Sequence, residues 1–148
     1  MIEEYATFED TTALAGRRTS IDFGPLGRTG LQVSRAGFGG YRIGDGIAEH
    51  GAALSRALVS GVNLVDTSAN YADGGSETLV GNVLENLTAG GKLDRRQVTV
   101  ISKVGYLQGE NFHLSQQRKQ AGRPFPELVQ YGKGLEHCIH PEFIADQL

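Results

Sequence analysis

Three side chains that can move a proton stand at the ends of two apolar runs. Asp66 ends the run at residues 62–66, Tyr71 follows five residues later, and Lys103 follows the run at residues 98–102. If both runs are parallel strands, their carboxyl ends meet at one edge of the sheet. A phenol there can protonate a developing alkoxide, and an ammonium beside it stabilises the remaining phenolate. The pattern therefore indicates a proton-donating site suited to carbonyl reduction.

The segments that must position these groups alternate between strand and helix patterns. Residues 21–33 contain two short alternating stretches around a turn rich in glycine and proline, which predicts a β-hairpin. Three buried strands and two helices follow, at residues 36–40, 47–59, 62–66, 76–88 and 98–102, with Ser76 expected to cap the second helix. This order predicts an α/β fold with a parallel sheet.

The remaining segments carry weaker signals. Residues 1–20 show no helical or strand period, so we expect a flexible N-terminal segment. Residues 105–134 form a long connection with a short helix at 112–120, and this connection is long enough to act as a lid over the strand ends. Pro141 begins a helix whose apolar face is not complete at Leu148, so we expect a truncated chain.

Composition limits the class of protein. A chain of 148 residues is long enough for one domain. Its formal charge of −3 comes without a basic stripe, which argues against nucleic-acid binding. No apolar run approaches the roughly 18 residues of a membrane span. The single cysteine, Cys138, cannot form an internal disulfide, so we expect a cytoplasmic protein.

The segments with chemistry resemble the aldo-keto reductases. The likeness is strongest at residues 61–71, 75–81 and 101–104. It implies the N-terminal part of a (β/α)8 TIM barrel, with about three βα units after the hairpin, in a partial domain at residues 21–148. It also implies an NADPH-dependent oxidoreductase that acts on a small-molecule carbonyl or alcohol substrate.

The resemblance assigns roles to the three side chains. Tyr71 becomes the proton donor, Lys103 the group that tunes its acidity, and Asp66 the partner of that lysine. The family also uses a histidine at the end of the fourth strand, for which these residues offer no counterpart. His137 and His140 precede the last helix and receive no such role. We therefore expect the chain to be inactive by itself.

The same resemblance places part of a cofactor site at the first strand end. Gly39, Gly40 and Tyr41 would lie near the nicotinamide ribose and pyrophosphate, where small residues permit close approach. The resemblance places Asp66 in this cofactor site as well. Family members hold the adenosine and phosphate portions with the seventh and eighth strands, so we expect most of the NADPH site to lie outside these residues.

Three other motifs give weaker evidence for a function. The glycines in residues 37–40 lack the G-x-G-x-x-G spacing of a dinucleotide-binding loop. His137, Cys138 and His140 lack the second ligand pair of a structural zinc site, so we predict no metal. The polar run at residues 116–120 reads as a solvated helix face.

A non-catalytic alternative rests on the sheet edge. A sheet that ends at residues 98–102 exposes unpaired backbone groups, which natural sheets usually pair or cover. The chain would then be a non-catalytic remnant or a protein-interaction module that binds through this edge. The same edge predicts self-association.

Overall fold

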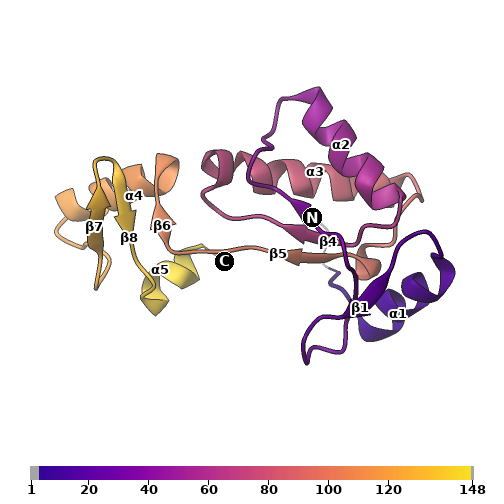
Figure 1. The fold of residues 1–148 in the computed structure, drawn as a ribbon. Coiled ribbons are helices and arrows are strands. Elements are labelled where there is room, and N and C mark those ends of the chain that lie inside the picture. Colours follow the sequence, from indigo (N-terminus) through magenta and orange to yellow (C-terminus); the bar gives the residue numbers. More distant parts are fainter. Residues whose placement is uncertain (1–3, 148) are drawn as a thin grey trace.

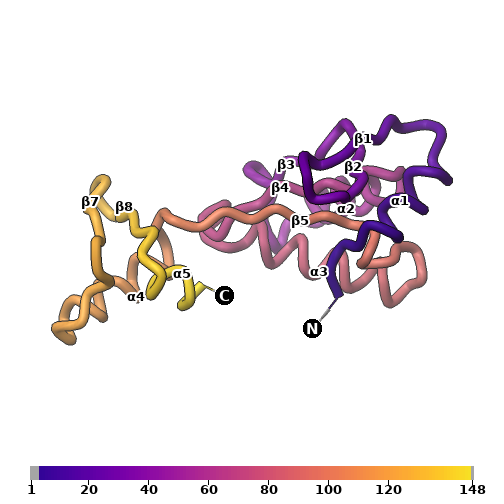
Figure 2. The backbone as a smooth tube through the Cα atoms, turned by 90° about the horizontal axis from the view of Figure 1, so that it is seen from below, coloured from indigo at the N-terminus to yellow at the C-terminus, as the bar shows by residue number. Residues whose placement is uncertain are grey.

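The computed structural model describes residues 4–147 and contains two parts. The elements of the larger part are, in chain order, α1 (Phe8–Arg17), β1 (Phe23–Pro25), β2 (Gln32–Ser34), β3 (Phe38–Gly39), α2 (Ala48–Val59), β4 (Leu64–Asp66), the 3₁₀ helix η1 (Tyr71–Gly74), α3 (Gly75–Ala89), the 3₁₀ helix η2 (Arg95–Gln97) and β5 (Thr99–Ile101). The smaller part contains β6 (Tyr106–Leu107), α4 (Gly109–Gln120), β7 (Val129–Gly132), β8 (Leu135–His137) and α5 (Pro141–Asp146). An extended stretch after β5 joins the two parts (Figures 1 and 2).

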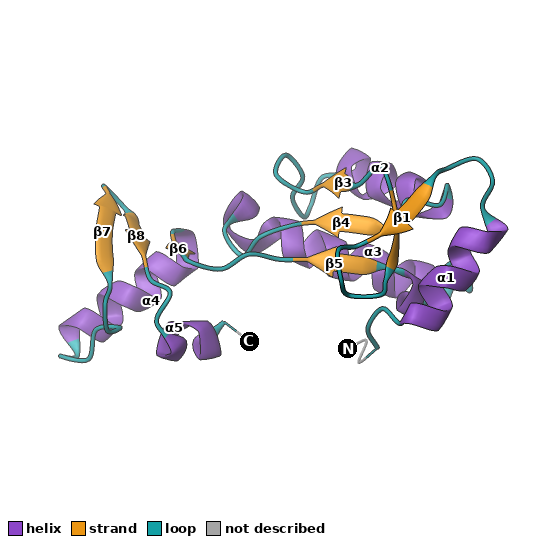
Figure 3. Cartoon of the chain, turned by 60° about the horizontal axis from the view of Figure 1, so that its bottom comes forward, coloured by secondary structure: helices purple, strands orange, loops and turns teal. Residues whose placement is uncertain are grey.

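A parallel sheet with the order β3-β4-β5 forms the centre of the larger part (Figure 3). α2 and α3 lie together on one face of this sheet (Figure 1). Apolar residues of these helices and strands form one buried core, which includes Leu54, Leu58, Val65, Leu79, Val80, Val83, Leu84, Leu87 and Val98. The predicted α/β fold is confirmed, and the carboxyl ends of the three strands lie at one edge.

The predicted hairpin is present as the antiparallel pair β1 and β2. A buried asparagine, Asn63, anchors it to the sheet. Its Oδ1 accepts a hydrogen bond from the backbone N–H of Ser34 at 2.7 Å. Its Nδ2 donates to the carbonyl oxygens of Gln32 at 3.0 Å and Gln97 at 2.9 Å. One side chain therefore joins the hairpin, β4 and η2 at the amino-terminal end of the sheet.

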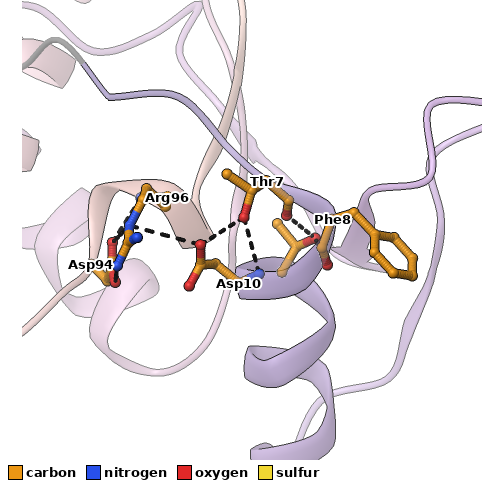
Figure 4. A network of polar contacts seen from close by, with 6 residues as sticks. Thr7, Phe8, Asp10, Asp94 and Arg96 are labelled. Carbon is orange, nitrogen blue, oxygen red and sulfur yellow. Dashed lines mark hydrogen bonds and ion pairs between the residues drawn. The ribbon is translucent and has the colours of Figure 1, made fainter.

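The structure differs from the irregular segment expected for residues 1–20, because Phe8–Arg17 form α1. Thr7 caps this helix by accepting a hydrogen bond from the Asp10 N–H at 3.1 Å. Arg96 then pairs with Asp10 at 3.7 Å and with Asp94 at 2.9 Å (Figure 4). These contacts fix the start of α1 against η2. Residues 1–3 of the predicted flexible segment lie outside the described residues.

Ser76 does not cap α3, which corrects the sequence prediction. The helix begins one residue earlier, with Gly74 at the N-cap in a left-handed conformation. Ser76 is fully buried, and its hydroxyl bonds to Thr67 Oγ1 at 2.8 Å and to the Gly40 carbonyl at 3.0 Å. It therefore ties α3 to the ends of β3 and β4.

The long connection at residues 105–134 contains regular structure that the sequence did not predict. β6 and β7 pair antiparallel with β8, which lies between them. α4 begins at Gly109, three residues before the predicted helix. This small sheet extends away from the carboxyl ends of β4 and β5 and does not cover them as a lid would (Figures 1 and 3).

The polar run at residues 116–120 is not simply a solvated helix face. Gln116 and Lys119 both donate hydrogen bonds to Glu136, whose side chain is buried on β8. Arg118 lies 4.0 Å from the centre of the Phe125 ring and pairs with Glu142. These residues close the core of the smaller part, which is formed by Leu107, Phe125, Cys138 and Phe143.

The last described helix begins at the proline that the sequence predicted. Pro141 is the first residue of α5, and the His140 side chain caps that helix. Leu148 lies outside the described residues. Among residues 4–147, β5 is an edge strand of the parallel sheet, and no helix is both long and apolar enough to cross a membrane.

Candidate active site

An ion pair joins the ends of β4 and β5. Lys103 follows β5 by two residues, and its Nζ donates to Asp66 Oδ1 at 2.7 Å and to the Thr67 carbonyl at 2.6 Å. Both side chains of the pair are about half exposed, so water screens their attraction. Partial desolvation lowers the pKa of Lys103, but the Asp66 carboxylate and the Tyr71 phenol raise it more, and the net pKa lies above its ordinary value.

Tyr71 lies directly beside this ammonium. The Lys103 Nζ is 4.7 Å from the centre of the Tyr71 ring, within the range of a cation–π contact. After Tyr71 the backbone takes three left-handed residues in succession, Ala72 and Asp73 near φ 50° and Gly74 at φ 92°. This conformation costs about 1–3 kcal/mol at each non-glycine residue, and such strain often occurs at functional sites. The turn holds Tyr71 between the end of β4 and the start of α3.

The end of β3 contributes a third side to the site. Gly39 is exposed, and a Cβ there would meet nothing within 4 Å. Gly40 is buried, and its Cβ would lie 2.6 Å from Ser76 Oγ and 2.9 Å from the Asp66 carbonyl oxygen. Tyr41 packs its ring edge-on against Tyr71 with centroids 5.1 Å apart. The surface at Gly39 is therefore open, whereas close packing within the chain is enough to require a glycine at position 40.

The structure brings together all the residues predicted for the catalytic group and for the first strand end. It also adds polar residues that the sequence reasoning did not select. The Ser68 hydroxyl lies 2.6 Å from Asn70 Oδ1 and 3.1 Å from the Lys103 carbonyl. The Lys103 carbonyl also accepts the Ala69 N–H at 3.1 Å. The sequence feature that could have identified these residues is the run of small polar residues directly after the strand that ends at Asp66.

The histidine and cysteine motif does not form a metal site. The Cys138 thiol is buried and lies 3.3 Å from the Pro126 carbonyl, and His140 caps α5. His137 packs its ring against Tyr106 with centroids 5.1 Å apart. In the part of the chain that the structure describes, no three histidine, cysteine or acidic side chains gather as metal ligands do.

The geometry supports one kind of chemistry. Asp66, Tyr71 and Lys103 meet at the carboxyl ends of parallel strands, where enzymes with such sheets bind their ligands. The phenol can give a proton to a carbonyl oxygen, and the ammonium can stabilise the phenolate. The carboxylate holds the ammonium in place. Side chains from the ends of two neighbouring strands, β4 and β5, therefore converge beside the Tyr71 phenol.

Comparison with known proteins agrees with this geometry. L-galactose dehydrogenase of Arabidopsis thaliana is 32% identical over 131 residues, which are 84% of this chain and 40% of the relative. The NADH-specific methylglyoxal reductase of Escherichia coli K12 is 38% identical over 89 residues, which are 55% of this chain and 26% of that relative. The chain thus spans well under half the length of either relative.

The fold and the family profile point the same way. The holo form of an aldo-keto reductase from Bacillus halodurans superposes with a TM-score of 0.52 at 27% identity, over 61% of this chain and 28% of that one. The profile of the aldo/keto reductase family matches residues 35–122, more than half of the chain. These residues include the whole of the parallel sheet and the Asp66, Tyr71 and Lys103 group. The chain belongs to the aldo/keto reductase family.

Proposed function

We propose that this chain supplies the proton-donating residues of a nicotinamide-dependent oxidoreductase that interconverts a carbonyl and an alcohol. Tyr71 donates a proton to the substrate carbonyl oxygen in reduction, and its phenolate accepts that proton from the alcohol in oxidation. The observation that carries this proposal is the position of Lys103. Its ammonium lies 4.7 Å from the centre of the Tyr71 ring and 2.7 Å from the Asp66 carboxylate.

Lys103 and Asp66 have different parts in this proposal. Because the pKa of Lys103 lies above its ordinary value, the side chain is a cation at neutral pH. A fixed positive charge beside Tyr71 stabilises the phenolate and so helps the phenol release its proton. Asp66 would keep Lys103 in place, because its carboxylate and the Thr67 carbonyl hold the flexible lysine side chain at the strand ends.

The proposal places part of a nicotinamide cofactor at the end of β3. We propose NADPH, held in part by Gly39, Gly40, Tyr41 and Asp66. Two observations support this: a Cβ at Gly39 would meet nothing within 4 Å, and the exposed ring of Tyr41 packs against Tyr71. When bound, the reduced cofactor supplies the hydride for the carbonyl carbon. The E. coli relative is named as NADH-specific, so turnover measured with NADPH and with NADH tests the choice of cofactor.

The substrate in this proposal is a small carbonyl or alcohol compound, in a protein located in the cytoplasm. Two relatives are named for methylglyoxal and for L-galactose. Both substrates are small and uncharged, which agrees with a site whose lysine is already paired with Asp66.

The single cysteine of the chain is compatible with a reducing compartment, which supports the proposed location in the cytoplasm.

Turnover by the native protein tests this proposal. We expect methylglyoxal to cause oxidation of NADPH, followed as the loss of absorbance of the reduced nicotinamide. Tyr71→Phe removes only the hydroxyl that donates the proton and should lower kcat by about 10²–10⁴-fold. Tyr5→Phe is the matched control, because Tyr5 is an exposed tyrosine on the segment before α1. A Tyr71→Phe protein that keeps the activity of the control would refute the role of Tyr71.

A second candidate function follows from the edge of the sheet. We propose that β5 can support association with another protein or with a second copy of the chain. Ile101 on β5 and Val104 after it are 37% and 43% exposed. A cavity of about 490 Å³ between β5 and α3 is lined in part by Val80, Leu84 and Val100. Sedimentation of the chain over a concentration series tests this, and a sharp monomer at high concentration would count against it.

A further inference from the structure

Three aromatic rings stand together on the small sheet. Tyr106 on β6 packs edge-on against Tyr131 on β7 and against His137 on β8, with ring centroids 5.4 and 5.1 Å apart. Tyr106 and Tyr131 are 39% and 64% exposed. A contiguous exposed apolar patch marks a binding site more often than a single exposed ring does. The small sheet therefore presents an aromatic wall, formed by Tyr106, Tyr131 and His137.

Part of this wall faces the proton-donating group. A cavity of about 220 Å³ is lined by Tyr71 and Lys103 on one side and by Tyr106 and His137 on the other. Ser68, Asn70 and Val104 complete its lining. The proposed proton donor and two rings of the wall thus border the same space, although residues far apart in the sequence supply them.

The backbone holds the wall in position. Tyr106 and His137 are partners in the β6–β8 ladder. Gly105 stands immediately before Tyr106 with φ near 141°, and its carbonyl accepts the Cys138 N–H at 2.8 Å. A Cβ at Gly105 would approach His137 Nε2 to 3.1 Å. Gln108, two residues after Tyr106, donates to the Asn70 carbonyl at 2.9 Å. The wall is therefore tied to the loop that precedes Tyr71.

We propose that Tyr106 and His137 determine substrate specificity by holding a ring of the carbonyl or alcohol substrate against the aromatic wall, with the reacting oxygen toward Tyr71. This inference rests on the proposed function and extends it to a class of substrate. The preferred substrate is an uncharged compound with a single aromatic or apolar ring.

Size and charge support this class. The cavity is smaller than the roughly 300–1,000 Å³ of pockets for drug-sized ligands, so it suits a single ring. The one lysine that lines it is engaged by Asp66, so it offers no free cation for a phosphate or carboxylate. Aromatic faces and edges instead bind other rings by stacking.

Benzaldehyde and methylglyoxal separate the wall from the proton donor. In the native protein, Tyr106→Ala should lower kcat/KM for benzaldehyde about three- to tenfold, because one ring contact is lost. The loss should appear in KM, because the contact is made equally in the ground and transition states. Methylglyoxal has no ring, so its kcat/KM should stay as in the control. Tyr106→Phe keeps the ring and should keep the activity, and Tyr5→Ala controls for the loss of an exposed tyrosine.

The outcomes distinguish the two proposals. An equal effect of Tyr106→Ala on both aldehydes, or no effect on either, would overturn the specificity wall while leaving the reductase reading intact. If the wild-type protein reduces neither aldehyde, the proposed function fails. Saturation-transfer NMR of benzaldehyde then tests the wall alone. Signal that Tyr106→Ala abolishes and Tyr106→Phe retains supports the wall, and signal equal in all three proteins overturns it.

Discussion

Two adjacent glycines at the end of β3 give a sharp test of how the site is built. Gly40→Ala adds a methyl group 2.6 Å from Ser76 Oγ and 2.9 Å from the Asp66 carbonyl oxygen. Gly39→Ala adds the same group where nothing lies within 4 Å. The two substitutions are chemically identical and one residue apart, so their difference isolates the packing around Gly40.

The cost of Gly40→Ala can be worked from these contacts. Ser76 can turn away only by giving up its bonds to Thr67 and to the Gly40 carbonyl, and each such bond contributes about 0.5–1.5 kcal/mol. The Asp66 carbonyl belongs to β4 and accepts the Gly40 N–H at 2.7 Å, so relief there requires the strand ends to separate. Overpacking of this kind costs about 1–3 kcal/mol. The free energy of unfolding should therefore fall by about 2–6 kcal/mol in total.

Urea unfolding of the native protein measures this difference. For a slope near 2 kcal/mol per molar urea, Gly40→Ala should lower the midpoint by about 1–3 M. Gly39→Ala should change the free energy of unfolding by less than about 0.5 kcal/mol. Because the added methyl group occupies the open surface at the strand end proposed for the cofactor, Gly39→Ala should still weaken nicotinamide binding, which fluorescence of the reduced cofactor reports.

A second variant keeps the reasoning open to refutation. Ser76→Gly in the Gly40→Ala background removes the closest contact and should recover part of the lost stability, although the contact with the Asp66 carbonyl remains. Equal midpoints for the Gly39→Ala and Gly40→Ala proteins would refute the close packing of β3, β4 and α3. A Gly39→Ala protein that binds the cofactor like wild type would refute the place given to Gly39.

Three further substitutions test contacts that support the fold. Glu136→Gln should destabilise residues 105–147 by about 1–3 kcal/mol at neutral pH. Burial raises the pKa of Glu136, but its bonds to Lys119 and neighbouring side chains lower that pKa more. The wild-type protein should therefore lose this stability as the pH falls through the lowered pKa, whereas the variant should not, and hydrogen exchange measures the difference. Asn63→Ala leaves three backbone groups without their partner and should cost about 2–4 kcal/mol in thermal unfolding. Thr7→Ala removes the cap of α1 and should cost about 1 kcal/mol, seen as faster exchange in that helix alone.

The sequence was informative where apolar residues recur at a regular period. The runs that end at Asp66 and before Lys103, and the helix between them, bury their side chains in one core, so periodicity predicted them and their order predicted the parallel sheet. The convergence of Asp66, Tyr71 and Lys103 followed from that order, because parallel strands bring their carboxyl ends to one edge.

The sequence was less informative where long-range contacts decide the structure. In α1 only Thr11 and Leu14 are buried, so its apolar stripe is too short to stand out, although the spacing of Thr7 and Asp10 is a helix-start signal. Ser76 has the residue type of a cap, but a buried bond to Thr67 determines its role.

The small sheet shows the same limit. β6 has two residues, and β8 buries Glu136, a side chain that sequence patterns assign to the surface. The donors that make this burial possible come from α4, about 20 residues earlier in the chain. The aromatic wall beside Tyr71 depends on this pairing, so the sequence alone did not reveal it.

The central claim is that Tyr71 and Lys103 act as one proton-donating unit, and a double-mutant cycle of turnover in the native protein tests it most directly. Because Lys103 acts only through the Tyr71 hydroxyl, adding Lys103→Met to the Tyr71→Phe protein should cause no further loss of kcat. If the losses from the two substitutions multiply in the double variant, the two residues act independently and the account is contradicted.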